Sequence, residues 1–438
     1  MLTTLKNAFK IKEIRQKILF TLGMLVVIRI GSQLPVPGVD TKFFSQWFAQ
    51  QTGGAFSFFD AITGGSFLNM SILALNINPY ITSSIIMQLL TIAIPKLEEM
   101  QRDGEDGRKK MVAITRYVTV ALALIQSTAM AIGFGRQGYL IEFNALNVIT
   151  TITALTAGSA FLMWVGERIT EKGIGNGISI VLVINIISRL PQDLSNLFEQ
   201  FVFGKAPATA ILAVVIIFAI IIAMVVLVII LNDGVRKIPV QYAKKMQGRK
   251  MVGGQTSNIP LKVNTSGVIP IIFAQSIMQF PIIICSFIGY NGTGVWAEIL
   301  KGLNSGYWCK PSQPIYSLGL LLYIVLIVFF AYFYTSITFN PLMIADNMKK
   351  QGGFIPGIRP GKPTSDYLNK ILNYLVFIGA VGLIIISVIP IMISGLFSVS
   401  QLSFMGTSLI IIVSVILETI KSIESQMIVR NYKGFLND

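Results

Sequence analysis

Long apolar stretches separated by short polar segments dominate this chain. The stretch from Ala206 to Asn232, for example, contains no charged residue. Because a helix of about 20 apolar residues spans the hydrocarbon core of a bilayer, this pattern predicts an all-α integral membrane protein. We expect ten transmembrane helices, at residues 18–36, 72–94, 111–133, 147–166, 174–190, 207–231, 267–289, 316–339, 371–394 and 402–420.

A short apolar piece precedes the second of these helices. Residues 57–68 are too few to cross a bilayer as a helix, and Gly64-Gly65 interrupts them. The second helix then begins with the polar, proline-containing sequence Asn76-Ile77-Asn78-Pro79. The pattern predicts a half-helix followed by a complete helix.

The seventh predicted helix begins in a similar way, with the sequence NTSGVIPIIFAQS around Pro270. Two halves of five helices each have opposite orientations in the membrane, because five is odd. Interrupted helices at matching places in two inverted halves mark a central path or site. On these residues alone, Pro79 and Pro270 are equally well explained as the ordinary prolines that membrane helices tolerate.

Positive charge gathers in alternate polar segments. If the N-terminus is cytoplasmic, the segments on that side hold all but seven of the 35 lysines and arginines, as the positive-inside rule requires. The seven others are Arg29, Lys42, Arg136, Arg189, Lys205, Lys301 and Lys310. We therefore predict that both termini are cytoplasmic. Arg29 lies inside the first span, and we expect its long side chain to reach the membrane surface.

The spans divide the chain into four parts: an amphipathic cytoplasmic N-terminal helix, two halves of five spans each, and a cytoplasmic tail. We expect no removable signal peptide at the N-terminus, and the second half carries two long cytoplasmic loops. The four parts are residues 1–17, 18–190, 191–425 and 426–438, and the two loops are residues 232–266 and 340–370.

The composition supports this class and excludes several chemistries. Hydrophobic residues make up 53% of the 438 residues and charged residues 13%, whereas a soluble domain carries about a quarter charged residues. No histidine is present, which removes histidine nucleophile pairs, metal sites and proton relays. Cys285 and Cys309 form no motif, and we expect two inert thiols unless the fold brings them together.

The glycine-rich segment Gly353 to Thr364 does not fit a nucleotide site. Aligning Gly361-Lys362 with a phosphate-binding loop places Pro356 at the first glycine and Pro363 at the hydroxyl position. Such a loop needs backbone N–H groups and that hydroxyl. We therefore expect no ATP site of this kind, no cofactor, no metal and no enzymatic activity.

The sequence fits two other classes of membrane protein less well. A secondary transporter with inverted repeats would have a polar pocket at the membrane midplane, and the spans offer aliphatic residues there instead. An intramembrane hydrolase without histidine would need a serine–lysine or paired-aspartate site, and the predicted spans contain none. The transporter is kept as the alternative.

Several segments, in order along the chain, resemble the SecY family of bacterial protein-translocation channels. No single segment is as specific as their order, which covers residues 18 to about 425. The resemblance implies ten helices in two inverted halves around a central pore. The segments are LPVPGVD (34–40), NINPYITSSIIMQLL (76–90), GERITEKGIGNGISI (166–180), LKVNTSGVIPIIFAQSI (261–277) and FNPLMIADNMKKQGGFIPGIRPGKPT (339–364).

The resemblance implies a plug and a pore ring. The plug of the family is the half-helix before the second span, and Gly64-Gly65 with Asn69 would give it a hinge. It would consist of Ser57, Phe58, Phe59, Asp60, Ala61, Ile62, Thr63, Gly64, Gly65, Ser66, Phe67 and Leu68. The family's ring of aliphatic side chains maps to Ile81, Ile85, Leu182, Ile186, Ile272 and Ile411. A narrow apolar ring closes a pore to ions by dewetting.

The resemblance also implies a lateral gate between spans 2–3 and 7–8, and docking loops. Polar side chains in spans need partners and favour helix–helix seams, and our gate candidates are Gln88, Gln126, Gln275 and Ser276. Arg249, Lys250 and Arg359 align with basic residues that the family uses to contact the SecA motor ATPase or the ribosome. Basic side chains can bind ribosomal RNA phosphates.

A function and partners follow from the resemblance. Unfolded preproteins would cross the bacterial cytoplasmic membrane through the pore, and signal sequences and membrane helices would leave through the gate into lipid. SecE and SecG would be partner subunits. The outer segment 291–314 matches no family motif, and we expect its Trp296 and Trp308 at the membrane interface.

Overall fold

The computed structural model consists almost entirely of helices and describes residues 8–41, 43–44, 60, 63–138, 140–203, 207–242, 245–247, 250–252, 256–288, 294–397 and 407–434. The sequence is predominantly apolar, and a helix satisfies all its backbone hydrogen bonds within one segment. The described α-helices are α2 Lys12–Gly31, α5 Asn78–Ala93, α6 Pro95–Arg102, α7 Gly104–Arg136, α8 Ala145–Lys172, α9 Gly177–Phe201, α10 Pro207–Asp233, α11 Ile269–Ile288, α12 Val295–Leu303, α13 Leu318–Thr338, α14 Pro341–Lys350, α15 Lys362–Phe397 and α16 Thr407–Gly434.

Within the described residues, six helical stretches are long and apolar enough to cross a membrane. They fall on α7, α8, α9, α10, α13 with α14, and α15. A seventh crossing results if α5 and α6 count as one span bent by 106°. Pro95 begins α6 and holds Ile94 in an extended conformation, as proline does to the residue before it. The remaining predicted spans fall on α2, α11 and α16, so the count of ten stays a prediction.

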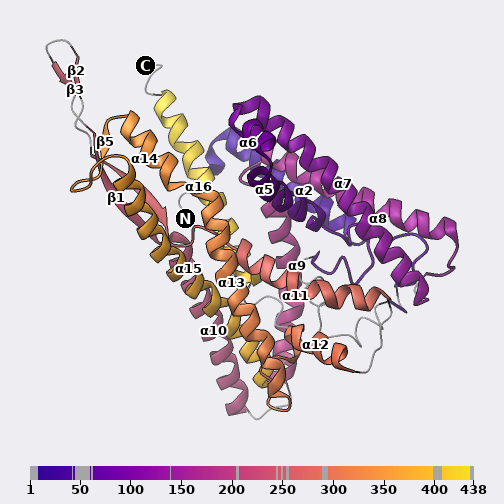
Figure 1. Cartoon of the computed structure of the whole chain (residues 1–438). Helices are drawn as coiled ribbons and strands as arrows, with labels where there is room; N and C mark the ends of the chain where they lie inside the picture. The colour runs from indigo at the N-terminus through magenta and orange to yellow at the C-terminus, as the bar shows by residue number, and fades with distance from the viewer. Residues whose placement is uncertain are drawn as a thin grey trace.

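Two groups of helices pack around separate apolar cores. In one, Ile28 of α2, Leu162 of α8 and Val181 of α9 are buried together. In the other, Val228 of α10, Ile271 of α11 and Leu383 of α15 are buried together. The helix α16 contributes to both cores, and α7 contacts α11 across the groups. Figure 1 shows the N-terminal helices in indigo to magenta on one side and the C-terminal helices in orange on the other.

The two long loops predicted from the sequence form one small sheet. Strand β1 (Val235–Tyr242) pairs antiparallel with β4 (Thr256–Lys262) and, on its other edge, with β5 (Gly353–Phe354). Ile238 and Val240 alternate toward the interior, where Leu261 and Leu368 cover them. The short strands β2 (Lys245–Gln247) and β3 (Lys250–Val252) pair at the tip of the hairpin, away from the helices (Figure 1). The loops therefore share one rigid base.

The first and the last described stretches of the chain lie side by side. Ala8 and Ile14 are buried against Ile423 of α16. The Lys17 ammonium donates a hydrogen bond to Oε1 of Gln426 at 3.1 Å. This contact is consistent with the predicted position of both termini on one side of the membrane.

The two tryptophans of the outer segment differ in their exposure. Trp308 is 3% exposed and belongs to the C-terminal core, where it packs against Tyr323. Its indole N–H donates to the Gly302 carbonyl at 2.7 Å, which satisfies the one polar group of the ring. Trp296, on α12, is 50% exposed. Trp308 thus faces the protein core, because the short helix α12 supplies the acceptor that a buried indole needs, and its depth relative to the membrane interface stays a prediction.

Candidate functional site

A cavity of about 810 Å³ opens between the two groups of helices. Its polar side is formed by Asn232, Asn264 and Glu418, with Lys421 next to them. Asn264 Nδ2 donates to Asn232 Oδ1 at 3.0 Å, and Lys421 pairs with Asp233 at 2.7 Å. The cavity therefore has a polar wall to which the ends of α10 and α16 contribute.

The six aliphatic residues predicted as a ring come together beside this cavity. Five of them, all but Ile186, line it, and Ile186 packs in the same apolar core as four of the others. Leu182 is 9%, Ile186 2% and Ile411 6% exposed, whereas Ile81, Ile85 and Ile272 are half-buried. The residues reach this place from α5, α9, α11 and α16. Pairs four residues apart, such as Leu182 and Ile186, share one helix face.

The start of α9 is fixed by local chemistry. Gly175 adopts a left-handed conformation, with φ of 72°. Asn176 then caps the helix, because its side-chain oxygen accepts from the backbone N–H groups of Ile178 and Ser179 at 3.2 and 3.4 Å. Such a cap satisfies donors that have no partner inside the helix. It sets the register that directs Leu182 toward the cavity.

The predicted plug is described only in part. Ser57–Phe59 and Ala61–Ile62 lie outside the described residues. Residues 64–70 form turns, and Gly64 and Gly65 have φ of 66° and 83°. Phe67 is 4% exposed and packs edge-on against Phe44 and Phe134 at 5.7 and 6.3 Å between ring centroids. The predicted half-helix therefore does not extend through residue 68, because two consecutive left-handed residues end it.

Polar contacts fasten this segment to α9 and α2. Asp60 is fully buried and forms an ion pair with Arg189. Both terminal nitrogens of Arg29 lie 3.4 Å from the Gly64 carbonyl oxygen, and the Ser188 hydroxyl lies 3.3 Å from it. The Arg29 side chain is therefore directed at acceptors inside the protein, and its reach to the membrane surface stays a prediction.

Sequence reasoning missed Arg189, Ser188 and Asn185 as parts of the site. Asn185 is 2% exposed, accepts from Arg29 at 3.4 Å and donates to the side-chain oxygen of Asn76 at 3.0 Å. One signal could have found them. Asp60 is the only charge in an apolar segment, and a buried carboxylate needs a cation.

The predicted gate residues fall on helices that meet or that border the cavity. Gln88 of α5 lines the cavity. Gln126 lies on α7, and Gln275 and the exposed Ser276 lie on α11, which α7 contacts. The side-chain oxygen of Gln275 is buried without a hydrogen-bond partner among the described residues, as is that of Gln279. Helix α11 therefore carries two buried oxygens that have no partner among the described residues.

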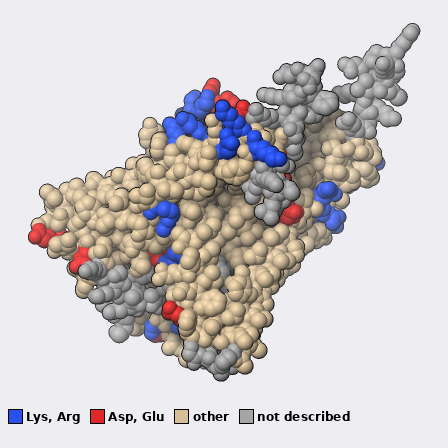
Figure 2. All heavy atoms as spheres, turned by 180° about the vertical axis from the view of Figure 1, so that it is seen from behind, with Lys and Arg blue, Asp and Glu red and all other residues tan. Residues whose placement is uncertain are grey.

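The predicted docking residues lie on the sheet and its neighbouring turn. Arg359 is exposed, in a turn closed by a hydrogen bond from the Thr364 hydroxyl to the Arg359 carbonyl at 2.8 Å. Lys250 begins β3 at the hairpin tip, and Arg249 lies outside the described residues. Figure 2 shows lysine and arginine side chains gathered at the end of the molecule that carries α6.

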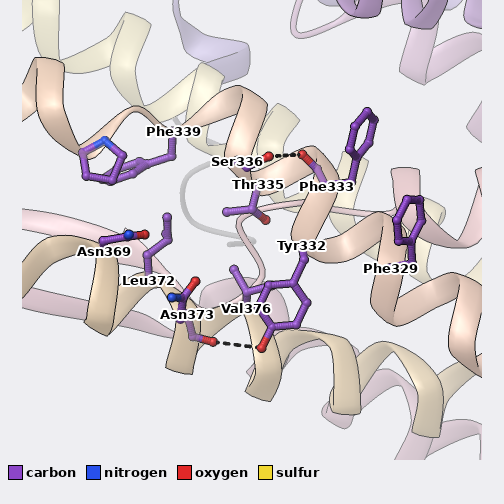
Figure 3. Close-up of a pocket in the computed structure, with 11 residues that line it drawn as sticks. Phe329, Tyr332, Phe333, Thr335, Ser336, Phe339, Asn369, Leu372, Asn373 and Val376 are labelled. Carbon is purple, nitrogen blue, oxygen red and sulfur yellow. Dashed lines mark hydrogen bonds between the residues drawn. The ribbon is translucent and has the colours of Figure 1, made fainter. Parts of the chain in front are cut away.

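A second cavity, of about 530 Å³, lies between α13 and α15 (Figure 3). The aromatic side chains of Phe329, Tyr332 and Phe333 form much of its wall, and the Tyr332 hydroxyl donates to the Asn373 carbonyl at 3.4 Å. Neither an ionisable carboxylate nor a cysteine lines it. The cavity thus has the character of a hydrophobic groove rather than a reactive site.

The described residues offer no metal centre, since no three of their cysteine, aspartate and glutamate side chains converge. Cys285 and Cys309 are both free thiols. Burial raises the pKa of the Cys309 thiol, which lies between α12 and α13.

The sequence comparisons with known proteins match the SecY family. The family model described as SecY matches residues 71–420. A relative from Streptomyces galbus, the protein translocase subunit SecY, is 44% identical over 457 aligned positions that cover all of both chains.

Solved structures share the fold at low sequence identity. One, described as showing that the SecY plug domain stabilises the closed state of the translocation channel and maintains a membrane seal, has a TM-score of 0.63 at 18% identity. Another, Sec61 in the canine ribosome–channel complex from the endoplasmic reticulum, has a TM-score of 0.61 at 17% identity. Each alignment covers 97% of both chains.

Proposed function

This chain belongs to the SecY family, and we propose that it is the central pore-forming subunit of a Sec translocon in the bacterial cytoplasmic membrane. Unfolded preproteins would cross through the cavity and the aliphatic ring. The observation that carries the proposal is the convergence of Ile81, Leu182, Ile272 and Ile411 from four helices beside one cavity with a polar wall.

The chemistry of that convergence suits a channel for polypeptides. Aliphatic side chains offer no ligand to an ion, and a narrow apolar constriction stays dry when nothing occupies it. They also form no specific hydrogen bonds, so chains of any sequence can slide past them. A secondary transporter needs polar groups that recognise one substrate, and the ring provides none. The transporter reading is not favoured.

The segment Ser57–Leu68 is proposed as the plug that seals the resting pore. Its described part, Asp60 and Thr63–Leu68, contacts α9, the helix that carries Leu182 and Ile186 of the ring. Signal sequences and nascent membrane helices would leave sideways between α5–α7 and α11–α13. The buried, unpartnered oxygen of Gln275 supports a seam that opens at modest cost, because an unsatisfied polar group gains hydrogen bonds when the seam is wetted.

The sheet and the turn at Arg359 are proposed as the docking surface for a driving partner on the cytoplasmic side. Either the SecA motor ATPase or the ribosome would supply the work, since the sequence contains neither a phosphate-binding loop motif nor a histidine. SecE would hold the two groups of helices together and SecG would be accessory. Both termini would be cytoplasmic.

Ion conductance across a planar bilayer tests the channel and plug together. The chain, reconstituted with its SecE-type partner, is compared with a variant that lacks residues 57–68. The proposal predicts a tight intact channel and a leaking deletion. If neither protein conducts ions although the variant is shown to be inserted in the bilayer, the plug assignment is contradicted. The secondary transporter would then be the better explanation.

A further inference from the structure

The contact between Asp60 and Arg189 joins the proposed plug to the helix that carries two ring residues. Asp60 is 0% exposed, and the Arg189 side chain is 14% exposed. The other Asp60 oxygen accepts from the Leu68 backbone N–H at 2.9 Å, which folds the described part of the plug around the carboxylate. A buried carboxylate with this environment depends on its cation.

A second attachment point lies at Gly64, four residues after Asp60 in the sequence. The Gly64 carbonyl lies within hydrogen-bonding reach of Arg29 on α2 and of Ser188 on α9. No side chain fits at Gly64, because an added Cβ would lie 2.4 Å from the Asn185 carbonyl oxygen. The plug segment is therefore held against α9 at two places, by charge at Asp60 and by close backbone contact at Gly64.

Arg189 has a second carboxylate within electrostatic reach. Asp193, four residues further along α9, interacts with Arg189 and is 1% exposed. Residues four apart on a helix lie on the same face. If Asp60 departs with the plug, Arg189 is not left as an isolated buried cation, because Asp193 remains beside it.

We propose that Arg189 is a positioning residue that holds the plug closed through its ion pair with Asp60. When the plug leaves, Arg189 pairs with Asp193 instead. Arg29 provides a second attachment through the Gly64 carbonyl. This inference rests on the proposed channel function and identifies the contacts that keep the channel closed at rest. Leu182, Asn185, Ile186, Ser188 and Arg189 follow one another within two turns of α9, so movement of this helix reaches both the ring and the clamp.

Resting conductance of the chain reconstituted with its SecE-type partner is the first test. Asp60→Asn and Arg189→Gln should each raise the leak about tenfold or more, because either substitution removes the ion pair that holds the plug segment against α9. Arg189→Gln also leaves the Asp60 carboxylate buried without its cation. Arg189→Lys keeps a cation at this position and should leak less than Arg189→Gln, which a purely steric role would not predict. Arg136→Gln, at the end of α7, is the matched control and should leave the channel tight.

Asp193→Asn tests whether Arg189 changes its ion-pair partner from Asp60 to Asp193, or only holds the plug in its closed position. It should keep the resting channel tight and slow the translocation of a secretory protein several-fold, because Arg189 then loses its alternative partner. Unchanged translocation by Asp193→Asn would overturn the exchange. A tight D60N or R189Q channel would overturn the clamp, provided that deletion of residues 57–68 leaks. If the deletion is also tight, the plug assignment itself fails.

Discussion

Ile81 of α5 and Ile272 of α11 pack into the same apolar core and line the same cavity, although each belongs to a different group of helices. α16 completes the arrangement, because its neighbouring residues Ile410 and Ile411 enter different cores. The two groups are therefore joined along one side and separated by the cavity on the other. Widening the cavity would therefore draw Ile272 away from the core that it shares with Ile81.

The first prediction concerns the seal at the ring. Replacing Ile272 by threonine places a hydroxyl in the constriction, and a wetted constriction no longer excludes ions. We expect a measurable rise in resting conductance and a further rise when Ile81→Thr is added. Ile222→Thr is the matched control, because Ile222 is 60% exposed on α10 and faces away from the core. Equal conductance of the ring and control variants would contradict the ring assignment.

The second prediction compares two adjacent glycines. Gly64→Ala and Gly65→Ala both carry strain of about 1–2 kcal/mol from a left-handed conformation, since their φ values are 66° and 83°. Only at Gly64 would the new Cβ meet α9, at 2.4 Å from the Asn185 carbonyl oxygen, whereas nothing lies within 4 Å at Gly65. Gly64→Ala should leak strongly and Gly65→Ala weakly. The reverse order would show that close packing on α9 does not hold this segment.

The third prediction concerns the seam between α7 and α11. Gln275→Leu removes a buried oxygen that has no partner among the described residues and should stabilise the closed seam by about 1–3 kcal/mol. Weakly hydrophobic test segments should then enter the lipid less efficiently, as measured by the inserted fraction of a series of graded hydrophobicity. Ile277→Val, at an exposed position on α11, should leave the series unchanged. An unaltered series for Gln275→Leu would argue against a gate at this seam.

The fourth prediction concerns docking. Arg359→Glu should reduce SecA-dependent translocation severely and weaken any ribosome binding, with an effect that shrinks as salt rises. Lys362→Glu changes a nearby exposed charge and should have a smaller effect. If both substitutions act alike, net charge rather than the presented Arg359 side chain governs docking.

The fifth prediction tests whether the sheet positions Arg359. Val240 is 1% exposed on β1, next to Gln241, which pairs with Phe354 of β5. Val240→Asp would bury a carboxylate without a partner, at a cost of several kcal/mol. Docking should weaken as it does in Arg359→Glu, although Val240 is distant in sequence. Normal docking would show that the turn at Arg359 keeps its shape without the sheet.

The helices were the most predictable part of the fold. A long apolar segment by itself predicts a helix, because inside a membrane a helix satisfies all its backbone hydrogen bonds within one segment. The grouping of Leu182 with Ile186 also followed from a spacing of four residues. The convergence of Ile81, Ile272 and Ile411 came from the family resemblance, since nothing in the spacing of single isoleucines distinguishes packing from a pore.

The parts that were missed depend on partners far apart in the sequence. The glycine- and proline-rich segments predicted loops rather than strands. Buried and exposed side chains alternate along β1, but its partner β5 is more than a hundred residues away in the sequence. The contact of Arg29 with the Gly64 carbonyl could not be predicted, because the acceptor is a backbone atom that no side-chain pattern reveals. The burial of Trp308 could not be predicted for the same reason, because its acceptor is the Gly302 carbonyl.

The most direct measurement of the central claim follows a secretory protein arrested during translocation. The chain is prepared with Cys285 and Cys309 replaced and a single cysteine placed at Ile81, Ile272 or Ile411, with Ile222→Cys as the lipid-facing control. The arrested protein carries cysteines at successive positions. We predict disulfides from each ring position to the residues of the substrate inside the membrane and none from Ile222. Crosslinking at Ile222 but not at the ring would contradict passage through the pore.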